Sequence, residues 1–117
     1  MASNLTTVLS EFLKVSGVNA VALVGRDGFV IESAASENVD MEALGAMVAT
    51  AIGTSEALGG EFSLGSMMQY LVEFERGKVV IATAGDDILA LFTDSSAVIG
   101  GVRYAVKKNI DALVKAM

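Results

Sequence analysis

Cysteine, histidine and proline are all absent from this 117-residue sequence. Without cysteine the chain forms no disulfide and no thiolate metal site, so the sequence gives no sign of secretion. Without histidine it lacks the commonest general base and the commonest metal ligand. These absences disfavour histidine-dependent catalysis and thiolate or histidine metal centres, and we expect neither a cofactor nor a metal.

Basic charge and long uncharged runs are also scarce. Fourteen acidic and eight basic residues give a net charge of −6, which argues against binding to nucleic acid or to an anionic membrane surface. The longest interval without a charge, Ala43 to Ser55, is shorter than the roughly 20 residues that a membrane span needs. The N-terminus, MASNLTTVL, lacks the basic segment of a signal peptide. We therefore expect a cytoplasmic protein with one domain, residues 1–117, and no membrane insertion.

Apolar spacing and turn residues predict three helices and five strands. Asp40 caps the second helix and Gly59-Gly60 end it. The first two strands are joined by Gly25-Arg26-Asp27-Gly28, which predicts a hairpin. The order is helix, two strands, helix, three strands, helix, which predicts an α/β (α+β) fold with α/β/α layers around a five-stranded antiparallel sheet. The expected helices cover 5–13, 40–58 and the residues after a cap at Asp94, Ser95 or Ser96, and the expected strands are Val18–Val24, Phe29–Ala35, Met67–Glu75, Lys78–Ala84 and Ile88–Thr93.

Apolar residues occupy both faces of most of these strands. In the last strand Ile88, Ala90 and Phe92 alternate with Leu89 and Leu91, whereas many antiparallel sheets have one wet face. Five strands span about 24 Å, and one helix with its side chains is about 10 to 12 Å across. If the first and last helices cover one face, the middle helix is alone on the other. We therefore expect a second copy of the chain to supply cover there.

The middle helix and the third strand offer a surface for that second copy. Gly45, Ala49, Gly53 and Ala57 form a row of small residues that lets two helices approach closely; the alternative is that this row lets the helix lie close to its own sheet. The segment Met67–Val72 carries no charge and, at an edge, is an open template for strand pairing. The predicted dimer interface consists of Met41, Gly45, Val48, Ala49, Ile52, Gly53, Glu56, Met67, Met68, Tyr70 and Val72.

Methionines also gather in this region. Met41, Met47, Met67 and Met68 lie on the middle helix and the possible edge strand. Methionine adapts to irregular partners, so the group serves either as a recognition surface or in core and dimer packing.

Few residues have the spacing of a chemical site. Arg26-Asp27-Gly28 offers a phosphate contact, an arginine finger or a metal ligand, but a tight turn needs the same residues. Asp86-Asp87 with Asp94 lacks the spacing of a calcium loop. Arg103, Lys107 and Lys108 give the last helix a basic patch that either meets an acidic partner or is a solvated face.

Several segments together resemble a known family. They are the leucine helix Leu5 to Leu13, Gly17-Val18-Asn19-Ala20 leading into Val21 to Val24, Arg26-Asp27-Gly28-Phe29-Val30-Ile31, the small-residue helix after Asp40, Tyr70 to Phe74, and Gly100-Gly101. In this order they resemble the roadblock/dynein light chain family, including the MglB-type prokaryotic regulators of small Ras-like GTPases. The resemblance covers nearly the whole chain, and it carries no catalytic signature.

The resemblance implies a roadblock-like fold that works as a dimer. One continuous sheet would cross the two-fold axis through antiparallel third strands, with the middle helices paired on one face. It also implies a non-catalytic homodimer that binds and regulates a small Ras-like GTPase. The alternative is a light-chain-type adaptor or scaffold in a larger assembly without a GTPase. A third class, a small-molecule sensor or an enzyme, is disfavoured because convergent polar groups are missing from the sequence.

Overall fold

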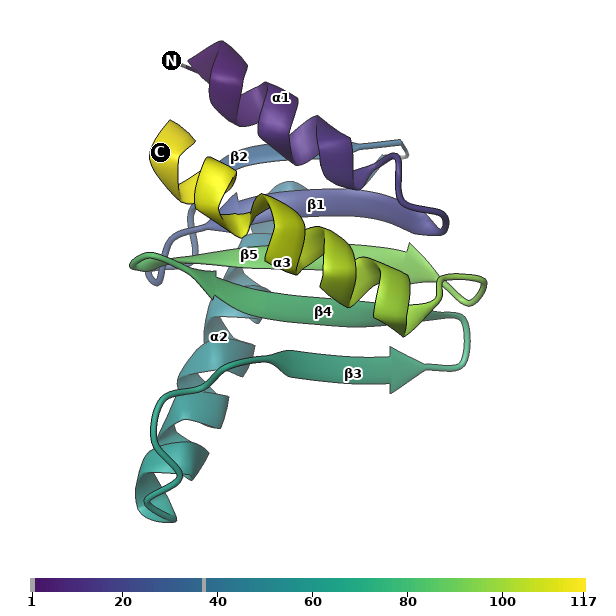
Figure 1. The fold of residues 1–117 in the computed structure, drawn as a ribbon. Helices are drawn as coiled ribbons and strands as arrows, with labels where there is room; N and C mark the ends of the chain where they lie inside the picture. Colours follow the sequence, from purple (N-terminus) through teal and green to yellow (C-terminus); the bar gives the residue numbers. More distant parts are fainter. Residues whose placement is uncertain (1, 37) are drawn as a thin grey trace.

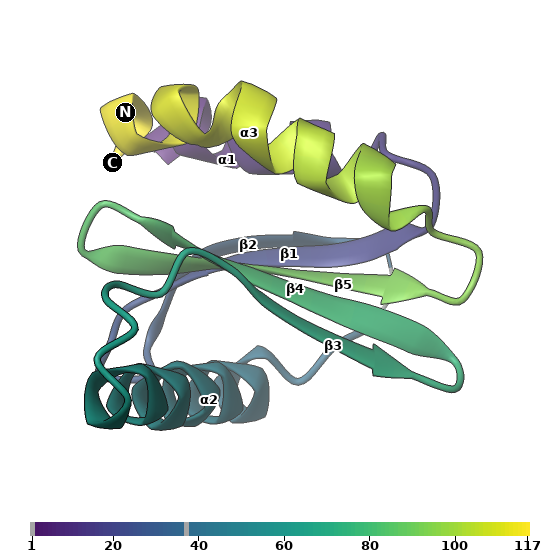
Figure 2. The same cartoon turned by 60° about the horizontal axis from the view of Figure 1, so that its bottom comes forward.

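The fold consists of three layers, an antiparallel sheet with helices on both sides. The computed structural model describes residues 2–36 and 38–117. Helices α1 (Ala2–Phe12) and α3 (Ile99–Ala116) lie side by side on one face of the sheet, and α2 (Met41–Glu61) lies alone on the other (Figures 1 and 2). The expected fold class and the expected order of elements are confirmed.

The five strands of the sheet are β1 (Val18–Val24), β2 (Val30–Ala35), β3 (Tyr70–Phe74), β4 (Gly77–Ala84) and β5 (Asp87–Asp94). The strand order is β2-β1-β5-β4-β3, and every neighbouring pair is antiparallel. The two edge strands are therefore β2 and β3.

Two separate apolar clusters fill the spaces above and below the sheet. The cluster under α1 and α3 contains Leu9, Phe12 and Leu113, whose side chains are fully buried. The cluster under α2 is smaller and includes Ile52. Neighbouring residues of one strand point to opposite clusters, as Leu89 and Ala90 of β5 do. Both faces of the sheet are therefore apolar, as the strand sequences predict.

The expected end of α2 at Gly59-Gly60 is wrong, because the helix continues through both glycines to Glu61. Glycine weakens a helix by about 1 kcal/mol relative to alanine, but it ends one only where the backbone turns left-handed. That turn comes later, at Ser63, which has a φ of 55°. The backbone N–H of Phe62 closes the helix by donating to the carbonyl of Leu58.

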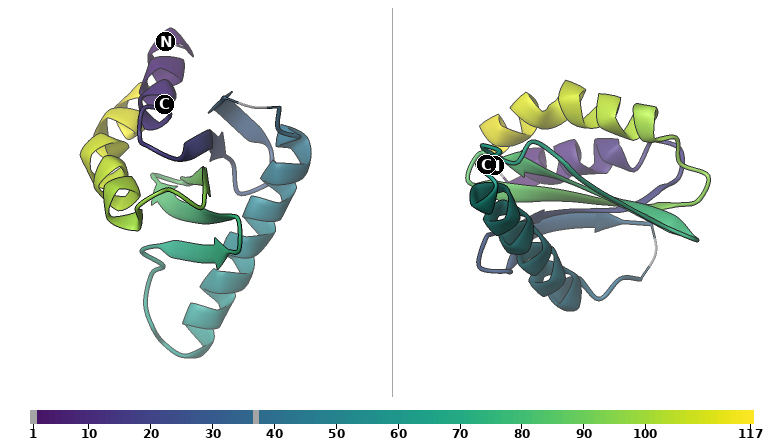
Figure 3. Two further views of the ribbon diagram at one scale, coloured as in Figure 1. Left: turned by 90° about the vertical axis from the view of Figure 1, so that its right-hand side faces the viewer. Right: turned by 90° about the horizontal axis from the view of Figure 1, so that it is seen from below.

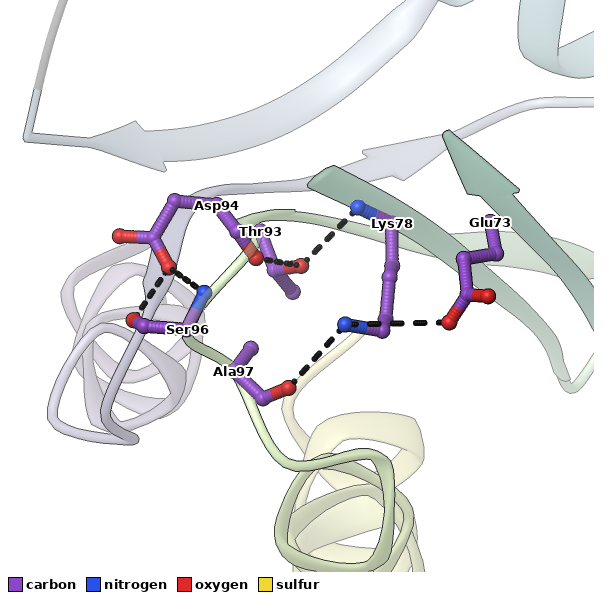
Figure 4. A network of polar contacts seen from close by, with 6 residues as sticks. All are labelled: Glu73, Lys78, Thr93, Asp94, Ser96 and Ala97. Carbon is purple, nitrogen blue, oxygen red and sulfur yellow. Dashed lines mark hydrogen bonds and ion pairs between the residues drawn. The ribbon is translucent and has the colours of Figure 1, made fainter. Parts of the chain in front are cut away.

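The expected side-chain cap of α3 is also wrong. The helix begins at Ile99, and its N-cap residue, Val98, makes no side-chain cap bond. Asp94 instead organises the turn that leaves β5: its Oδ1 accepts hydrogen bonds from the backbone N–H of Ser96 at 2.8 Å and from its hydroxyl at 2.5 Å (Figure 4).

Lys78 of β4 ties this turn to the sheet. Its backbone N–H donates to Thr93 Oγ1 at 3.1 Å, and its Nζ donates to the carbonyl of Ala97 at 3.3 Å (Figure 4). The same ammonium lies 4.0 Å from Glu73 Oε2. These bonds fix the point at which the chain enters α3, and thereby the position of α3 over β4.

Two glycines of α2 give a matched test of the packing of this helix. A Cβ on Gly45 would overlap the carbonyl oxygen of Gly28 in the β1–β2 hairpin, whereas a Cβ on Gly53 would meet nothing within 4 Å. We expect Gly45→Ala to lower the free energy of unfolding by about 1 to 3 kcal/mol. Gly53→Ala is expected to leave it unchanged or to raise it by up to about 1 kcal/mol. Urea denaturation at one fixed protein concentration measures both, and equal effects would contradict the placement of α2.

Asp94 predicts a pH dependence of stability. The Ser96 hydroxyl, followed by the Ser96 backbone N–H, lowers the pKa of Asp94 below its ordinary value of 3.8. Because the pKa is depressed in the folded state, the stabilisation is present above 3.8 and is lost as the pH falls through the folded value. Asp94→Asn should therefore be less stable than the wild type at pH 7, and this difference should shrink in strongly acidic buffer.

The control for this prediction is Asp111→Asn. Asp111 is exposed on α3, and its carboxylate makes no hydrogen bond or ion pair with any residue that the structure describes. Thermal unfolding of both variants from pH 2 to neutral pH gives the comparison. A pH-independent deficit for Asp94→Asn, or a deficit of the same size for Asp111→Asn, would contradict this account.

Candidate interaction surface on α2 and β3

The acidic residues suggested by the sequence do not form a cation site. Asp86 lies in the turn before β5, Asp87 begins the strand and Asp94 ends it, so roughly 23 Å of extended strand separates Asp87 from Asp94. Within residues 2–36 and 38–117 there is no group of three or more carboxylate, histidine or cysteine side chains placed to hold a metal ion.

The Arg26-Asp27-Gly28 segment forms a turn, and the turn interpretation is confirmed. Gly28 has a φ of 93°, a left-handed conformation that glycine adopts without strain. The backbone N–H of Gly25 donates to the carbonyl of Phe29 at 2.8 Å, and Asp27 Oδ1 accepts from the backbone N–H of Phe29 at 3.1 Å. The segment reverses the chain between β1 and β2.

The Arg26 guanidinium links this turn to α2. Its Nη1 lies 2.5 Å from Glu56 Oε1, and its Nε donates to the carbonyl of Asp86 at 3.0 Å. The bond to Glu56 is the main reason that the pKa of Arg26 is raised above its ordinary value. Both side chains are more than a third exposed, so the pair stabilises the fold by at most about 1 kcal/mol. Arg26 is thus held within its own chain, as is the Glu56 carboxylate.

The residues of the predicted dimer interface divide according to their exposure in the protomer. Gly45 packs against the β1–β2 hairpin so closely that a Cβ would not fit, so glycine at this position has an explanation within the chain. Gly53 has open space beside it. Gly45, Val48 and Ile52 are buried, Met41, Ala49, Glu56, Met67, Tyr70 and Val72 are half-buried, and Gly53 and Met68 are exposed.

An apolar groove of about 520 Å³ lies between α2 and the sheet. Met47 and Ala51 of α2 form one wall, and Val72, Val79 and Phe92 of strands β3, β4 and β5 lie on the sheet side. Met47 lines this groove, and 65% of this residue is exposed to solvent. The sequence did not identify Val79 and Phe92 as surface residues of an interaction site. The signal that pointed to them was the apolar character of both strand faces.

The C-terminal end of α2 projects beyond the sheet. Figures 1 and 3 show α2 crossing the sheet obliquely and extending past β3. Its main strand contacts are with β1 and β2 at the opposite edge. The projecting end and the following loop carry Leu58, Phe62 and Leu64, each at least 60% exposed. One end of α2 therefore presents apolar side chains to solvent while the groove on β3, β4 and β5 stays uncovered.

The edge of β3 adds an unpaired strand to this surface. β3 pairs with β4 on one side only, so its outward backbone groups have no sheet partner within the described chain. β3 is shorter than the expected Met67–Glu75, because the residues before Tyr70 leave the sheet. Gln69 instead accepts a hydrogen bond from Arg103 Nε at 3.0 Å.

Comparison with known proteins gives concordant matches in sequence and fold. The model of the Roadblock/LC7 domain matches residues 5–93. Uncharacterized protein MJ0310 of Methanocaldococcus jannaschii is 37% identical over 110 residues, which are 94% of this chain and 96% of that protein.

None of the helices described is long and apolar enough to span a membrane.

Two solved structures superpose closely on this fold. Myxococcus xanthus MglB has a TM-score of 0.90 at 22% sequence identity, with 97% of this chain and 94% of that chain covered. A structure described as MglB with tetrameric arrangement has a TM-score of 0.89 at 24% identity, with 97% and 87% covered.

Proposed function

Since the chain belongs to the roadblock/LC7 family, a family of non-catalytic interaction modules, we propose that it is a homodimer that binds and regulates a small Ras-like GTPase. Residues 1–117 act in this proposal as a single roadblock-type domain in the cytoplasm. The chain contributes binding, and the GTPase supplies its own catalytic residues.

Two observations carry the homodimer, the projecting end of α2 and the open groove on the sheet. In each protomer the apolar C-terminal end of α2 projects past β3 (Figure 3), and an apolar groove lies open between the first half of α2 and strands β3, β4 and β5. A two-fold axis beside β3 brings the projecting end of one protomer toward the sheet of the other, and the reverse contact follows by symmetry. The same axis sets the two β3 edges side by side for antiparallel pairing. The eleven residues of the predicted interface remain a prediction within this arrangement.

Self-association is also supported by a close structural neighbour. An MglB structure of the same fold is described as having a tetrameric arrangement. Because its sequence identity to this chain is 24%, the likeness itself extends to the fold alone. The GTPase as partner rests on the resemblance of the segments around Arg26-Asp27-Gly28 and Gly100-Gly101 to the MglB-type regulators, together with this shared fold.

Val72→Lys tests the homodimer. Val72 is a half-buried residue of β3 in the groove, and a lysine there would place two ammonium groups in the proposed interface. We expect the dissociation constant of the dimer to rise at least about a hundredfold, because both charges lose water. Ser33→Lys, on the opposite edge strand β2, is the matched control and should dimerise like the wild type.

Sedimentation and light scattering over a concentration series measure the mass of each protein. A wild type that stays monomeric throughout, or a Val72→Lys variant with unchanged dimer mass, would contradict the proposed interface. Gly53→Leu, at the open position on α2, is expected to weaken the dimer as well.

Affinity capture tests the GTPase. Immobilised wild type and Val72→Lys are incubated with lysate of the source organism that contains either a non-hydrolysable GTP analogue or GDP, and bound proteins are identified by mass spectrometry. We expect a Ras-like GTPase to be enriched on the wild type in one nucleotide condition. Recovery of filament or motor components without a GTPase would contradict the proposal and favour the adaptor alternative.

A further inference from the structure

A second groove lies on the opposite side of the sheet from α2, between α3 and β4. Its volume is about 640 Å³. Val80 and Ala82 of β4 with Val106 and Ile110 of α3 give it an apolar lining. We propose that this α3 groove binds an acidic, amphipathic segment of a partner protein, at a site separate from the α2–β3 surface.

The charges at the α3 groove are basic in an otherwise acidic protein. The chain carries a net charge of −6, yet the described groove lining includes Arg103 and Lys107 and no carboxylate. These two residues are four positions apart on α3 and therefore share one face. Arg103 donates to a neutral amide, Gln69 Oε1, and Lys107 forms no ion pair with the described residues. Both cations are thus available to carboxylates from outside the chain.

Gly100 leaves open space in the lining of the α3 groove. A Cβ at Gly100 would meet nothing within 4 Å, and the same is true of Gly101. Glycine is a weak helix former, and the packing of the described protomer offers no steric reason for glycine at either position. Gly100 lines the groove, whereas Gly101 does not. A glycine at this point lets the backbone of a bound segment approach α3 closely.

The groove favours a protruding peptide segment over a membrane. A concave apolar floor accepts side chains from one face of an amphipathic helix, whereas a lipid surface is flat and an anionic one is repelled by the net charge of −6. Carboxylates spaced by one helical turn on the bound segment would face Arg103 and Lys107. Tyr104, 65% exposed and part of the groove lining, provides an aromatic contact of the kind enriched at interfaces.

The first test uses a designed probe. The probe is an 18-residue fluorescein-labelled helical peptide with leucine on one face and glutamate on the other, and its binding is followed by fluorescence anisotropy at about 0.1 M salt, where charges remain partly screened. We expect Arg103→Glu with Lys107→Glu to weaken binding about tenfold or more. The control, Lys14→Glu with Lys115→Glu, makes the same change in net charge outside the groove and should bind like the wild type.

A second pair of variants tests the shape of the groove without changing charge. Gly100→Gln places a side chain in the groove and should weaken binding about fivefold or more, whereas Gly101→Gln should bind like the wild type. A Cβ at either position meets nothing within 4 Å, so we expect both proteins to fold. Thermal unfolding checks this. Val72→Lys should retain probe binding, which separates this site from the proposed homodimer.

Two results would overturn the proposal. In the first, both double variants lose probe binding equally, which would indicate a general charge effect. In the second, the probe does not bind the wild type. If vesicles of phosphatidylcholine with 30% phosphatidylserine then bind the wild type but not the Arg103→Glu, Lys107→Glu variant, the surface would be assigned to a membrane.

Discussion

A sheet that is apolar on both faces, with unequal cover on its two sides, is the constraint on which the rest of this structure depends. Two helices shield one face, where they enclose a cluster that includes Phe12 and Leu113. A single helix serves the other face, and its main strand contacts are with β1 and β2. The groove at β3, β4 and β5 is the part of that face left open. The projecting C-terminal end of α2 and the unpaired edge of β3 lie on this same open side.

The position of α2 depends more on packing than on polar contacts. The Arg26–Glu56 pair is partly exposed, and exposed pairs contribute little to stability. Ile52 is almost fully buried, and Gly45 lies so close to the Gly28 carbonyl that a methyl group would not fit. Packing between Gly45 and Ile52 therefore sets the helix angle, and that angle carries the C-terminal end of α2 past the sheet. An interaction surface arises here from the geometry of a core contact.

Local signals in the sequence predicted most of the elements and the open face, and they failed where tertiary geometry decides. Asp40 caps α2 through its bond to the Ala43 N–H, and Gly28 forms the turn that its position predicts. The predicted end of α2 at Gly59-Gly60 was wrong, because a glycine pair does not by itself impose a left-handed turn. The α3 groove was visible in the sequence only as a basic patch, since its apolar floor comes from β4.

Hydrogen–deuterium exchange of the two edge strands tests most directly whether a second copy covers this open side. Residues 70–74 of β3 and residues 30–35 of β2 each have one strand neighbour within the chain, so β2 is an internal reference. Pairing of β3 edges predicts that exchange in β3 slows as protein concentration rises, while exchange in β2 does not change. Exchange in β3 that stays as fast as in β2 at every concentration would contradict the account.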